Sequence, residues 1–308
     1  MKIVFTAAIL FFSMMASATP LNQIVIFGDS LSDNGNLYEY LNHQLPLSPP
    51  YFEGRFTNGP VWIEDLIQTY YPNNSKEHLA DYAFGGAGVL EDGDDELFTL
   101  DREMDSYFQA HHKTSDEQSL YVVWIGSNNY LGVPDDVEQS IGEVILGMKH
   151  GLQRLANNGA KNILVVNVPD LGRTPVARDM DAVERLTYVV QRHNVLLDKL
   201  IVELKGQYPD VHWVYFDVNL VFDEMLNHPS EHGFTNITDT CYEEIMPTEL
   251  MTSQSILKMV SSVKPKRIND PCKGYLFFDP VHPTGQAHQL MAEKTRLLLD
   301  NEGIEFQE

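Results

Sequence analysis

A serine, a histidine and an aspartate lie in segments whose local sequence suits them to one catalytic site. Ser30 follows directly on the apolar run Gln23–Phe27, so we expect it at the carboxyl end of a buried strand, where open α/β sheets bind ligands. Asp279 and His282 lie near the other end of the chain, in a Pro-rich stretch that is unsuited to a helix interior. A serine hydroxyl needs a base to accept its proton and a third group to orient that base. The three side chains therefore predict nucleophilic attack on a carbonyl.

Each motif taken alone also has a purely structural interpretation. Ser30 could be a helix N-cap, and Asp279 with His282 could form a hydrogen-bonded turn. The sequence around Ser30 is not Gly-x-Ser-x-Gly, so the nucleophile elbow of α/β hydrolases is absent. In a strand-to-helix turn, the Ser30 N–H would join the unpaired donors of the next helix and favour an oxyanion.

Strand and helix patterns alternate along the chain, which is typical of a parallel sheet covered by helices on both faces. A short strand is expected to enter Asp81-Tyr82-Ala83, ahead of Gly85 and Gly86. The other predicted strands are Gln23–Phe27, Leu120–Ile125, Asn162–Val168 and Val211–Phe216, and the main predicted helices are Val137–Asn157, Ala182–Lys205 and Gly285–Leu299.

Composition and charge restrict the class of protein. The 308 residues are 43% hydrophobic, which is enough for a sizeable core. The net charge of −23 argues against partners such as nucleic acid and anionic lipid, which are bound by clustered Lys and Arg. We therefore expect neutral, zwitterionic or cationic partners.

The first residues resemble an export signal. Lys2 precedes an apolar run from Ile3 to Met15, and the small residues Ala16-Ser17-Ala18 follow. This pattern predicts a signal peptide, residues 1–18, that is cut after Ala18. A membrane anchor is the alternative, but the run is shorter than the roughly 20 residues that a span requires. We expect a secreted or periplasmic protein without a transmembrane span.

The region from Pro229 to Gly274 shows no strand pattern and is predicted to be an insertion. It holds both cysteines, Cys241 and Cys272, and the basic cluster Lys264–Arg267. An exported chain meets oxidising conditions, so we expect one disulfide, with two free buried thiols as the alternative. Two cysteines without CxxC spacing disfavour a zinc site. The same region could form a short helix that either packs on the body or acts as a lid, with apolar residues at Leu250, Met251, Ile256, Leu257, Met259 and Val260.

The motifs together resemble the GDSL, or SGNH, hydrolase family. Six blocks follow one another in family order over almost the whole mature chain. The blocks are Phe27–Asn36, Gly54–Trp62, Tyr82–Ala87, Trp124–Asn129, Val168–Pro175 and Asp279–Pro283.

The resemblance implies a fold and a set of roles. The fold would be a three-layer α/β/α domain with a five-stranded, mostly parallel, flavodoxin-like sheet, covering residues 19–308 with a disulfide-closed insertion around 230–275. Ser30 would be the nucleophile, His282 the base and Asp279 the acid. The N–H groups of Ser30 and Gly85 and the amide of Asn128 would form the oxyanion hole, and no cofactor or metal is implied.

Two positions depart from the family pattern. Asp81 stands where the family commonly has Asn before Tyr-Ala, and Asn129 stands where Asp is usual. A changed hydrogen-bond partner there could tilt a neighbouring donor, Gly85 or Asn128.

The resemblance also implies a substrate class. The long first block, the Gly54–Trp62 segment and the signal peptide are similar to the bacterial secreted phospholipase branch, which includes lysophospholipases A and glycerophospholipid–cholesterol acyltransferases. We therefore predict hydrolysis of the fatty-acyl ester of a lysophospholipid or phospholipid, with acyl transfer to an alcohol such as a sterol as a further outcome. The alternatives are an esterase for acetylated carbohydrate or aryl esters, and a silent lipid-binding or adhesion module. A protease that nicks the Cys241–Cys272 loop is a predicted activating partner.

Overall fold

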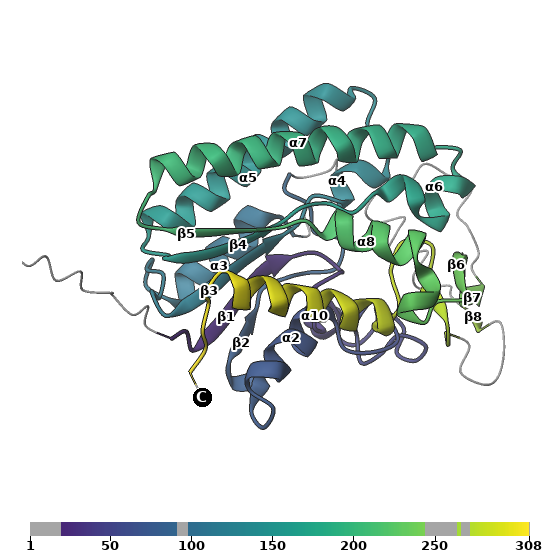
Figure 1. The fold of residues 1–308 in the computed structure, drawn as a ribbon, viewed down its shortest axis with the longest axis horizontal. Coiled ribbons are helices and arrows are strands. Elements are labelled where there is room, and N and C mark those ends of the chain that lie inside the picture. The colour runs from purple at the N-terminus through teal and green to yellow at the C-terminus, as the bar shows by residue number, and fades with distance from the viewer. Residues whose placement is uncertain (1–19, 91–97, 244–263, 266–271, 308) are drawn as a thin grey trace, which may run out of the picture.

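A central sheet of five parallel strands organises the molecule (Figure 1). The computed structural model describes residues 20–90, 98–243, 264–265 and 272–307. The strand order β2-β1-β3-β4-β5 is that of flavodoxin-like doubly wound folds, so the predicted fold class is confirmed. The strands are β1 (Gln23–Gly28), β2 (Leu79–Asp81), β3 (Ser119–Trp124), β4 (Asn162–Val166) and β5 (His212–Phe216).

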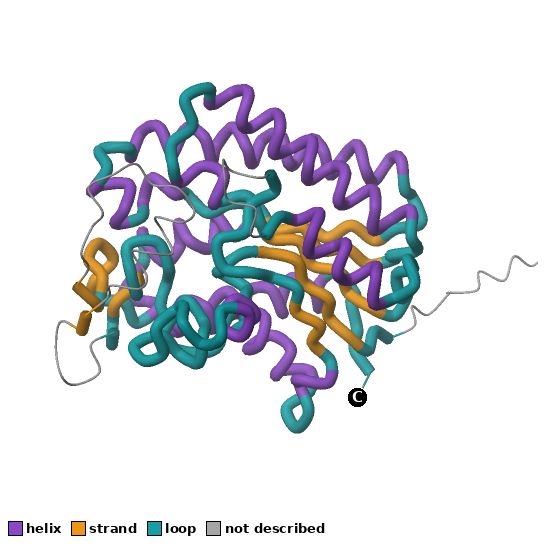
Figure 2. The backbone as a smooth tube through the Cα atoms, turned by 180° about the vertical axis from the view of Figure 1, so that it is seen from behind, coloured by secondary structure: helices purple, strands orange, loops and turns teal. Residues whose placement is uncertain are grey.

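Side chains on the strands alternate between two apolar clusters, one on each face of the sheet. On β1, Val25 and Phe27 join one cluster, whereas Ile24 and Ile26 join the other. This alternation follows from the two-residue period of a strand. The sheet is therefore buried on both sides, and Figure 2 shows its strands between helices.

Three helices contribute most of the covering side chains on each face. One face is covered by α3 (Leu100–Ala110), α5 (Val137–Asn157) and α7 (Val183–Gln207). The other face is covered by α2 (Trp62–Tyr70), α8 (Val218–Asn227) and α10 (Gly285–Asn301).

The predicted boundaries agree with the structure to within about two residues for the four long strands and for the three predicted helices, α5, α7 and α10. The strand expected at Asp81–Ala83 lies two residues earlier, as β2. Shorter elements occupy the connections: α1 (Asn36–Tyr40), η1 (Ser75–Glu77), α4 (Asn128–Leu131), η2 (Leu171–Arg173), α6 (Pro175–Asp179) and η3 (Pro229–His232).

The prediction that residues 229–274 contain no strand is wrong. β6 (Asn236–Thr240) pairs in parallel with β9 (Tyr275–Phe277), and β7 (Tyr242–Glu243) pairs with β8 (Lys264–Pro265). The β6 sequence Asn-Ile-Thr-Asp-Thr is polar and partly exposed, so it lacks the apolar alternation that identifies a strand. The helix predicted around 250–260 lies outside the described residues.

The chain reverses its winding direction at β1. From β1 the next strand, β2, lies on one side, and β3 then lies on the other side of β1. Such a switch point leaves a crevice at the carboxyl ends of the strands. Ser30 follows β1 at this edge. Within the described part of the chain, no helix is long and apolar enough to cross a membrane.

Candidate active site

A continuous chain of hydrogen bonds joins Ser30, His282 and Asp279. His282 Nε2 lies 2.7 Å from Ser30 Oγ, and His282 Nδ1 lies 2.7 Å from Asp279 Oδ2. The three side chains are buried, with 7%, 1% and 0% of their surface exposed. When Nδ1 carries the ring proton and donates it to Asp279, Nε2 is free to accept the Ser30 hydroxyl proton. The structure thus brings together the three residues that the sequence singled out.

Asp279 is held by its own turn and by a distant tyrosine. Its Oδ1 accepts the N–H groups of Val281 at 2.9 Å and His282 at 2.7 Å, and its Oδ2 accepts the Tyr51 hydroxyl at 2.7 Å. Burial opposes ionisation, but the charge and hydrogen bonds of His282, together with the Tyr51 hydroxyl, outweigh it and lower the pKa of Asp279. Asp279 is therefore an anion that can stabilise a protonated His282.

Ser30 lies in a tight turn after β1 rather than at a helix start. The carbonyl of Asp29 accepts the N–H groups of Ser32 and Asp33, and the Asp29 side chain accepts the Leu31 N–H. The next helix, α1, begins only at Asn36, so the alternative that Ser30 is a helix N-cap does not hold. The expectation that the Ser30 N–H joins the unpaired donors of the next helix is wrong. No hydrogen bond of the described residues uses the Ser30 N–H, which leaves it available to an oxyanion.

The loop of residues 82–88, which we call the glycine loop, holds one engaged and one available N–H. Gly85 donates its N–H to Asp33 Oδ2 at 2.7 Å, so the prediction that Gly85 supplies an oxyanion donor is not met in this structure. Glycine is required there because a Cβ would lie 2.3 Å from the Phe56 ring. The next residue, Gly86, has φ +81° and is only partly buried, and its N–H has no acceptor among the described residues. Gly86 is the better candidate.

Asn128 faces the same site from the first residue of α4. Its Nδ2 donates to the Ala87 carbonyl at 2.8 Å, which ties the amide to the glycine loop. The neighbouring Asn129 accepts the Val89 N–H at 2.8 Å and donates to the Leu90 carbonyl at 3.2 Å. The usual Asp could accept the first bond but, as a carboxylate, could not donate the second. This departure from the family pattern therefore leaves Asn128 supported.

A narrow pocket opens beside Ser30, Asn128 and His282. Its volume of about 30 Å³ is close to the share of one liquid water. Apolar side chains from several helical segments form much of its wall, namely Leu131, Leu171, Val218, Phe222 and Met291. A carbonyl substituent that enters this pocket would be surrounded by hydrocarbon.

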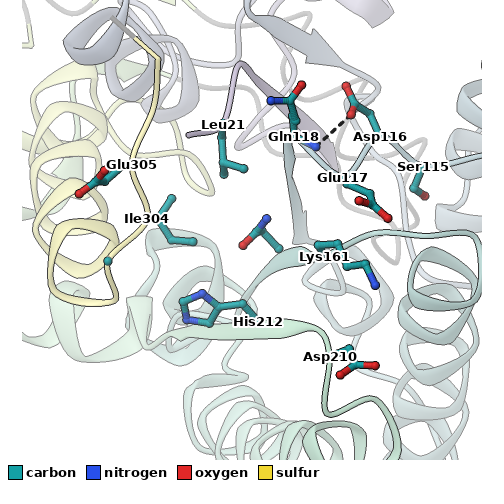
Figure 3. A pocket seen from close by; sticks show the side chains of 12 residues that line it. Leu21, Ser115, Asp116, Glu117, Gln118, Lys161, Asp210, His212, Ile304 and Glu305 are labelled. Atoms are coloured by element: carbon teal, nitrogen blue, oxygen red, sulfur yellow. Dashed lines mark hydrogen bonds between the residues drawn. The ribbon is translucent and has the colours of Figure 1, made fainter. Parts of the chain in front are cut away.

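A larger cavity, of about 860 Å³, lies at the amino ends of the strands (Figure 3). Residues just before the strands line it, including Gln118, Lys161 and Asp210. It contains none of the triad residues. It lies at the amino ends of the strands, whereas Ser30 follows the carboxyl end of β1.

The comparisons with known proteins agree with this geometry. The model of the GDSL-like Lipase/Acylhydrolase family matches residues 24–295. The chain belongs to this family. A phosphatidylcholine-sterol acyltransferase of Aeromonas hydrophila is 30% identical over 320 residues, which cover 93% of this chain and 92% of the relative.

Other relatives of this GDSL family member are longer. The secreted effector protein SseJ of Salmonella typhimurium is 29% identical, and the thermolabile hemolysin of Vibrio parahaemolyticus is 25% identical. The chain spans 62% and 63% of their lengths.

A crystal structure of a member of the lipolytic G-D-S-L family from Veillonella parvula has a TM-score of 0.44 at 15% identity, covering 89% of this chain and 95% of that one.

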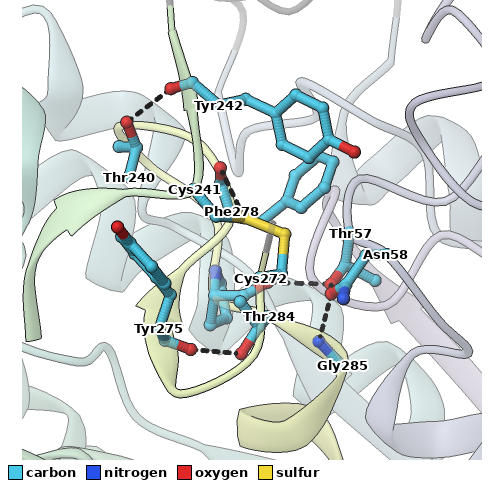
Figure 4. Close-up of a disulfide and its surroundings, with 11 residues drawn as sticks. Thr57, Asn58, Thr240, Cys241, Tyr242, Cys272, Tyr275, Phe278, Thr284 and Gly285 are labelled. Atoms are coloured by element: carbon cyan, nitrogen blue, oxygen red, sulfur yellow. Dashed lines mark hydrogen bonds between the residues drawn. A yellow bond between two sulfur atoms is a disulfide. The ribbon is translucent and has the colours of Figure 1, made fainter. Parts of the chain in front are cut away.

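The predicted disulfide of this GDSL protein is present next to the segment that carries Asp279 (Figure 4). Cys241 and Cys272 are bonded, and both are buried. The Cys241 N–H donates to the Phe277 carbonyl at 3.2 Å, and the Phe278 ring lies 4.9 Å from that of Tyr242. The base of the disulfide loop therefore contacts the residues just before the acid.

Two residues of the site were not identified from the sequence. Tyr51 lies between the first two family blocks, and nothing in its local sequence signals that it reaches Asp279. Gly86 adjoins Gly85, and a sequence alone does not show which of two adjacent glycines turns its N–H toward the site.

Proposed function

We propose that this GDSL-family chain is a serine esterase that hydrolyses the fatty-acyl ester of lysophospholipids or phospholipids through an acyl-enzyme on Ser30. The observation that carries the proposal is the hydrogen-bonded chain Ser30–His282–Asp279, in which both links are 2.7 Å. A geometry of this kind activates a hydroxyl for attack on a carbonyl.

The first half of the proposed reaction makes the acyl-enzyme. The Ser30 oxygen bonds to the ester carbon while His282 Nε2 takes the hydroxyl proton, and the carbonyl electron pair moves to the oxygen. Asp279 stabilises the resulting imidazolium. When the tetrahedral intermediate collapses, the bond to the alcohol breaks and His282 gives its proton to the leaving alkoxide.

The second half releases the fatty acid. Water bonds to the acyl carbon as His282 takes one of its protons, and the proton then returns to Ser30 as the acid departs. An alcohol in place of water would accept the acyl chain instead, and we propose this transfer, for example to a sterol, as a secondary outcome.

Three donors would stabilise the oxyanion in both halves. We assign this role to the N–H groups of Ser30 and Gly86 and to the side-chain amide of Asn128. The first two have no other acceptor among the described residues, and Asn128 is held beside them by its bond to Ala87. Each such donor contributes about 10²–10³ in rate in other enzymes.

The apolar pocket and the relatives support a fatty-acyl substrate. Phe222 and Met291 line a hydrocarbon-walled slot beside Ser30, and the Aeromonas relative is described as a phosphatidylcholine-sterol acyltransferase. We further propose that the chain is exported through the signal peptide predicted at residues 1–18, which lie outside the described part.

The test is fatty-acid release from a panel of lysophospholipids and phospholipids, with an acetylated sugar and an aryl acetate measured beside them. We expect the lysolipid to be cleaved fastest and Ser30→Ala to abolish cleavage. A preference for the acetylated sugar would overturn the lipid assignment in favour of a carbohydrate esterase. Failure of a fluorophosphonate to label Ser30 would favour the silent lipid-binding module.

A further inference from the structure

Four acidic side chains lie around the Ser30 turn and the glycine loop, and we call them the acid cluster. Asp29 and Asp33 flank Ser30, Asp81 ends β2, and Glu103 lies in the first turn of α3. Asp29, Asp33 and Glu103 are buried, with at most 2% of their surface exposed. Asp81 is partly exposed as a residue, but its Oδ2 is enclosed.

Two members of the acid cluster bind the main chain of the glycine loop. Asp33 Oδ2 accepts the Gly85 N–H at 2.7 Å, and Asp81 Oδ1 accepts the Ala83 N–H at 2.8 Å. These two bonds fix the start of the glycine loop, so the direction of the Gly86 N–H depends on them.

Three further hydrogen bonds lie between the Ser30 side and the glycine loop. Glu103 Oε2 accepts the N–H of Gly28, two residues before Ser30, at 2.9 Å. Asn36 donates from Nδ2 to the carbonyls of Asp81 and Ala83 at 3.0 and 2.9 Å. The acid cluster is therefore part of the connection between the nucleophile turn and the glycine loop.

No positive side chain among the described residues is ion-paired with the acid cluster. Arg55 interacts electrostatically with Asp33, but its guanidinium is bound to Glu64 at 2.6 and 3.1 Å. Glu64, from α2, adds further negative potential at Asp81, and His282 acts on Asp29. The charge around Asp81 and Glu103 is thus mainly negative.

Asp81 and Glu103 each hold one buried oxygen, Oδ2 and Oε1, without a hydrogen-bond partner. An ionised carboxylate there would have no positive ion-pair partner among the described residues and a hydrogen bond to only one of its two oxygens, so the neutral acid is favoured. Burial raises the pKa of both groups well above the usual range, and the neighbouring charge of Asp33 on Asp81, and of Asp81 on Glu103, raises it further. Burial also raises the pKa of Asp29 and of Asp33 to about 6.

We propose that Asp81 and Glu103 are positioning residues that hold the glycine loop against the Ser30 turn while they are protonated and release it when they ionise. Loss of their protons to solvent would strengthen the N–H bonds to Oδ1 and Oε2, but it would also place two unsolvated negative charges beside Asp33. Their mutual repulsion, and the solvation that Oδ2 and Oε1 then require, would drive the bound segments apart. The Gly86 N–H would then leave the oxyanion. This inference rests on the proposed esterase activity.

Asp81→Asn is the sharpest test because the amide keeps the Oδ1 acceptor for Ala83 and cannot ionise. We would measure kcat and KM for a soluble short-chain ester from pH 5 to pH 10. In the unmodified protein we expect kcat to fall at alkaline pH by about 10²-fold, the effect of losing one oxyanion donor. In Asp81→Asn that fall should be shifted to higher pH or lost, and Glu103→Gln should act in the same direction.

The matched control is Asp198→Asn on α7, an exposed aspartate outside the acid cluster. It should leave the pH profile unchanged. The inference is wrong if the alkaline limbs of the unmodified protein, Asp81→Asn and Glu103→Gln coincide.

A stability measurement separates this inference from the proposed activity. When the pKa of a carboxyl group is higher in the folded than in the unfolded protein, the free energy of unfolding falls as pH rises above the unfolded-state pKa. The reason is that only the unfolded chain then releases the proton. The unfolding midpoint of Asp81→Asn should therefore fall less than that of the unmodified protein as pH rises from 4 to 8. If no ester is cleaved at any pH, the proposed function fails. If the unfolding midpoints of Asp81→Asn and the unmodified protein shift equally with pH, Asp81 is not protonated in the folded protein, whatever the activity.

Discussion

The hydroxyl of Tyr51 donates a 2.7 Å hydrogen bond to Oδ2 of Asp279, the same oxygen that faces His282 Nδ1. Tyr51 is 2% exposed, and its ring packs 4.8 Å from that of Phe278. Because this oxygen orients the imidazole, Tyr51 fixes the base indirectly and stabilises the negative charge of Asp279.

Removing this hydroxyl should weaken catalysis without removing the nucleophile. A hydrogen bond to a charged group contributes about 1.5–3 kcal/mol, so Tyr51→Phe should lower kcat by roughly 10- to 100-fold with a smaller change in KM. Steady-state kinetics on a lysolipid would measure this. Tyr188→Phe is the matched control, since that tyrosine is 49% exposed and bonds Glu138 on α5. Equal kcat in Tyr51→Phe and the control would contradict the role.

The two adjacent glycines of the glycine loop should respond differently to substitution. Gly85→Ala places a Cβ 2.3 Å from the Phe56 ring, and overpacking of this kind destabilises by about 1–3 kcal/mol. Gly86→Ala alters a backbone with φ +81° and should turn its N–H away from the oxyanion. We therefore expect a lower unfolding midpoint for Gly85→Ala, and for Gly86→Ala a fall in kcat out of proportion to its loss of stability.

Asn128→Ala provides the reference for this comparison, because it removes an oxyanion donor by truncation. It should lower kcat by about 10²–10³ while KM changes little. If Gly85→Ala retained its stability and lost kcat as Asn128→Ala does, Gly85 would be the donor after all.

The apolar pocket should set the acyl-chain preference. With a volume of about 30 Å³ it must widen to admit a chain, and Phe222 on α8 lies in its wall. Phe222→Ala should raise kcat/KM for long acyl chains relative to short ones, as measured over a series of lysolipids from 6 to about 18 carbons. Leu220→Ala, which changes a 58% exposed residue of the same helix, is the control. An unchanged ratio of long-chain to short-chain rates would place the acyl chain elsewhere.

The sequence predicts the parts of this site that local patterns specify. Gln23–Phe27 is apolar throughout, so the strand before Ser30 could be predicted, and the turn sequence around Asp279 carries the acid and the base together. β6 could not be predicted because its residues are polar and pair with only one neighbour. The contact of Tyr51 with Asp279 spans 228 residues, and no local pattern encodes a contact that only the folded chain makes.

The disulfide loop should control access to the site through the residues that precede Asp279. Cys241 donates its N–H to the Phe277 carbonyl, and β7 and β8 pair at the base of the loop. A protease that cuts at the basic cluster Lys264–Arg267 would free the interior of the loop, while the disulfide keeps both ends on this segment. Partial digestion with trypsin should therefore raise the rate of fatty-acid release several-fold, with the fragments still joined until reduction.

Reduction of the disulfide should lower the stability of both the intact and the cut protein. In the intact protein the bond spans 31 residues, and a closed loop of that length contributes roughly 3–4 kcal/mol by chain-entropy arguments. In the cut protein the bond holds the two fragments together, so the cut and reduced protein should also unfold at a lower temperature. A variant with Lys258, Lys264, Lys266 and Arg267 all changed to Ala is the control, because it has no lysine or arginine between the two cysteines, and trypsin should no longer activate it. If complete cutting inside the loop left the rate of fatty-acid release unchanged, the loop would not shield the site, and its contacts with Phe277 and Phe278 would serve stability alone.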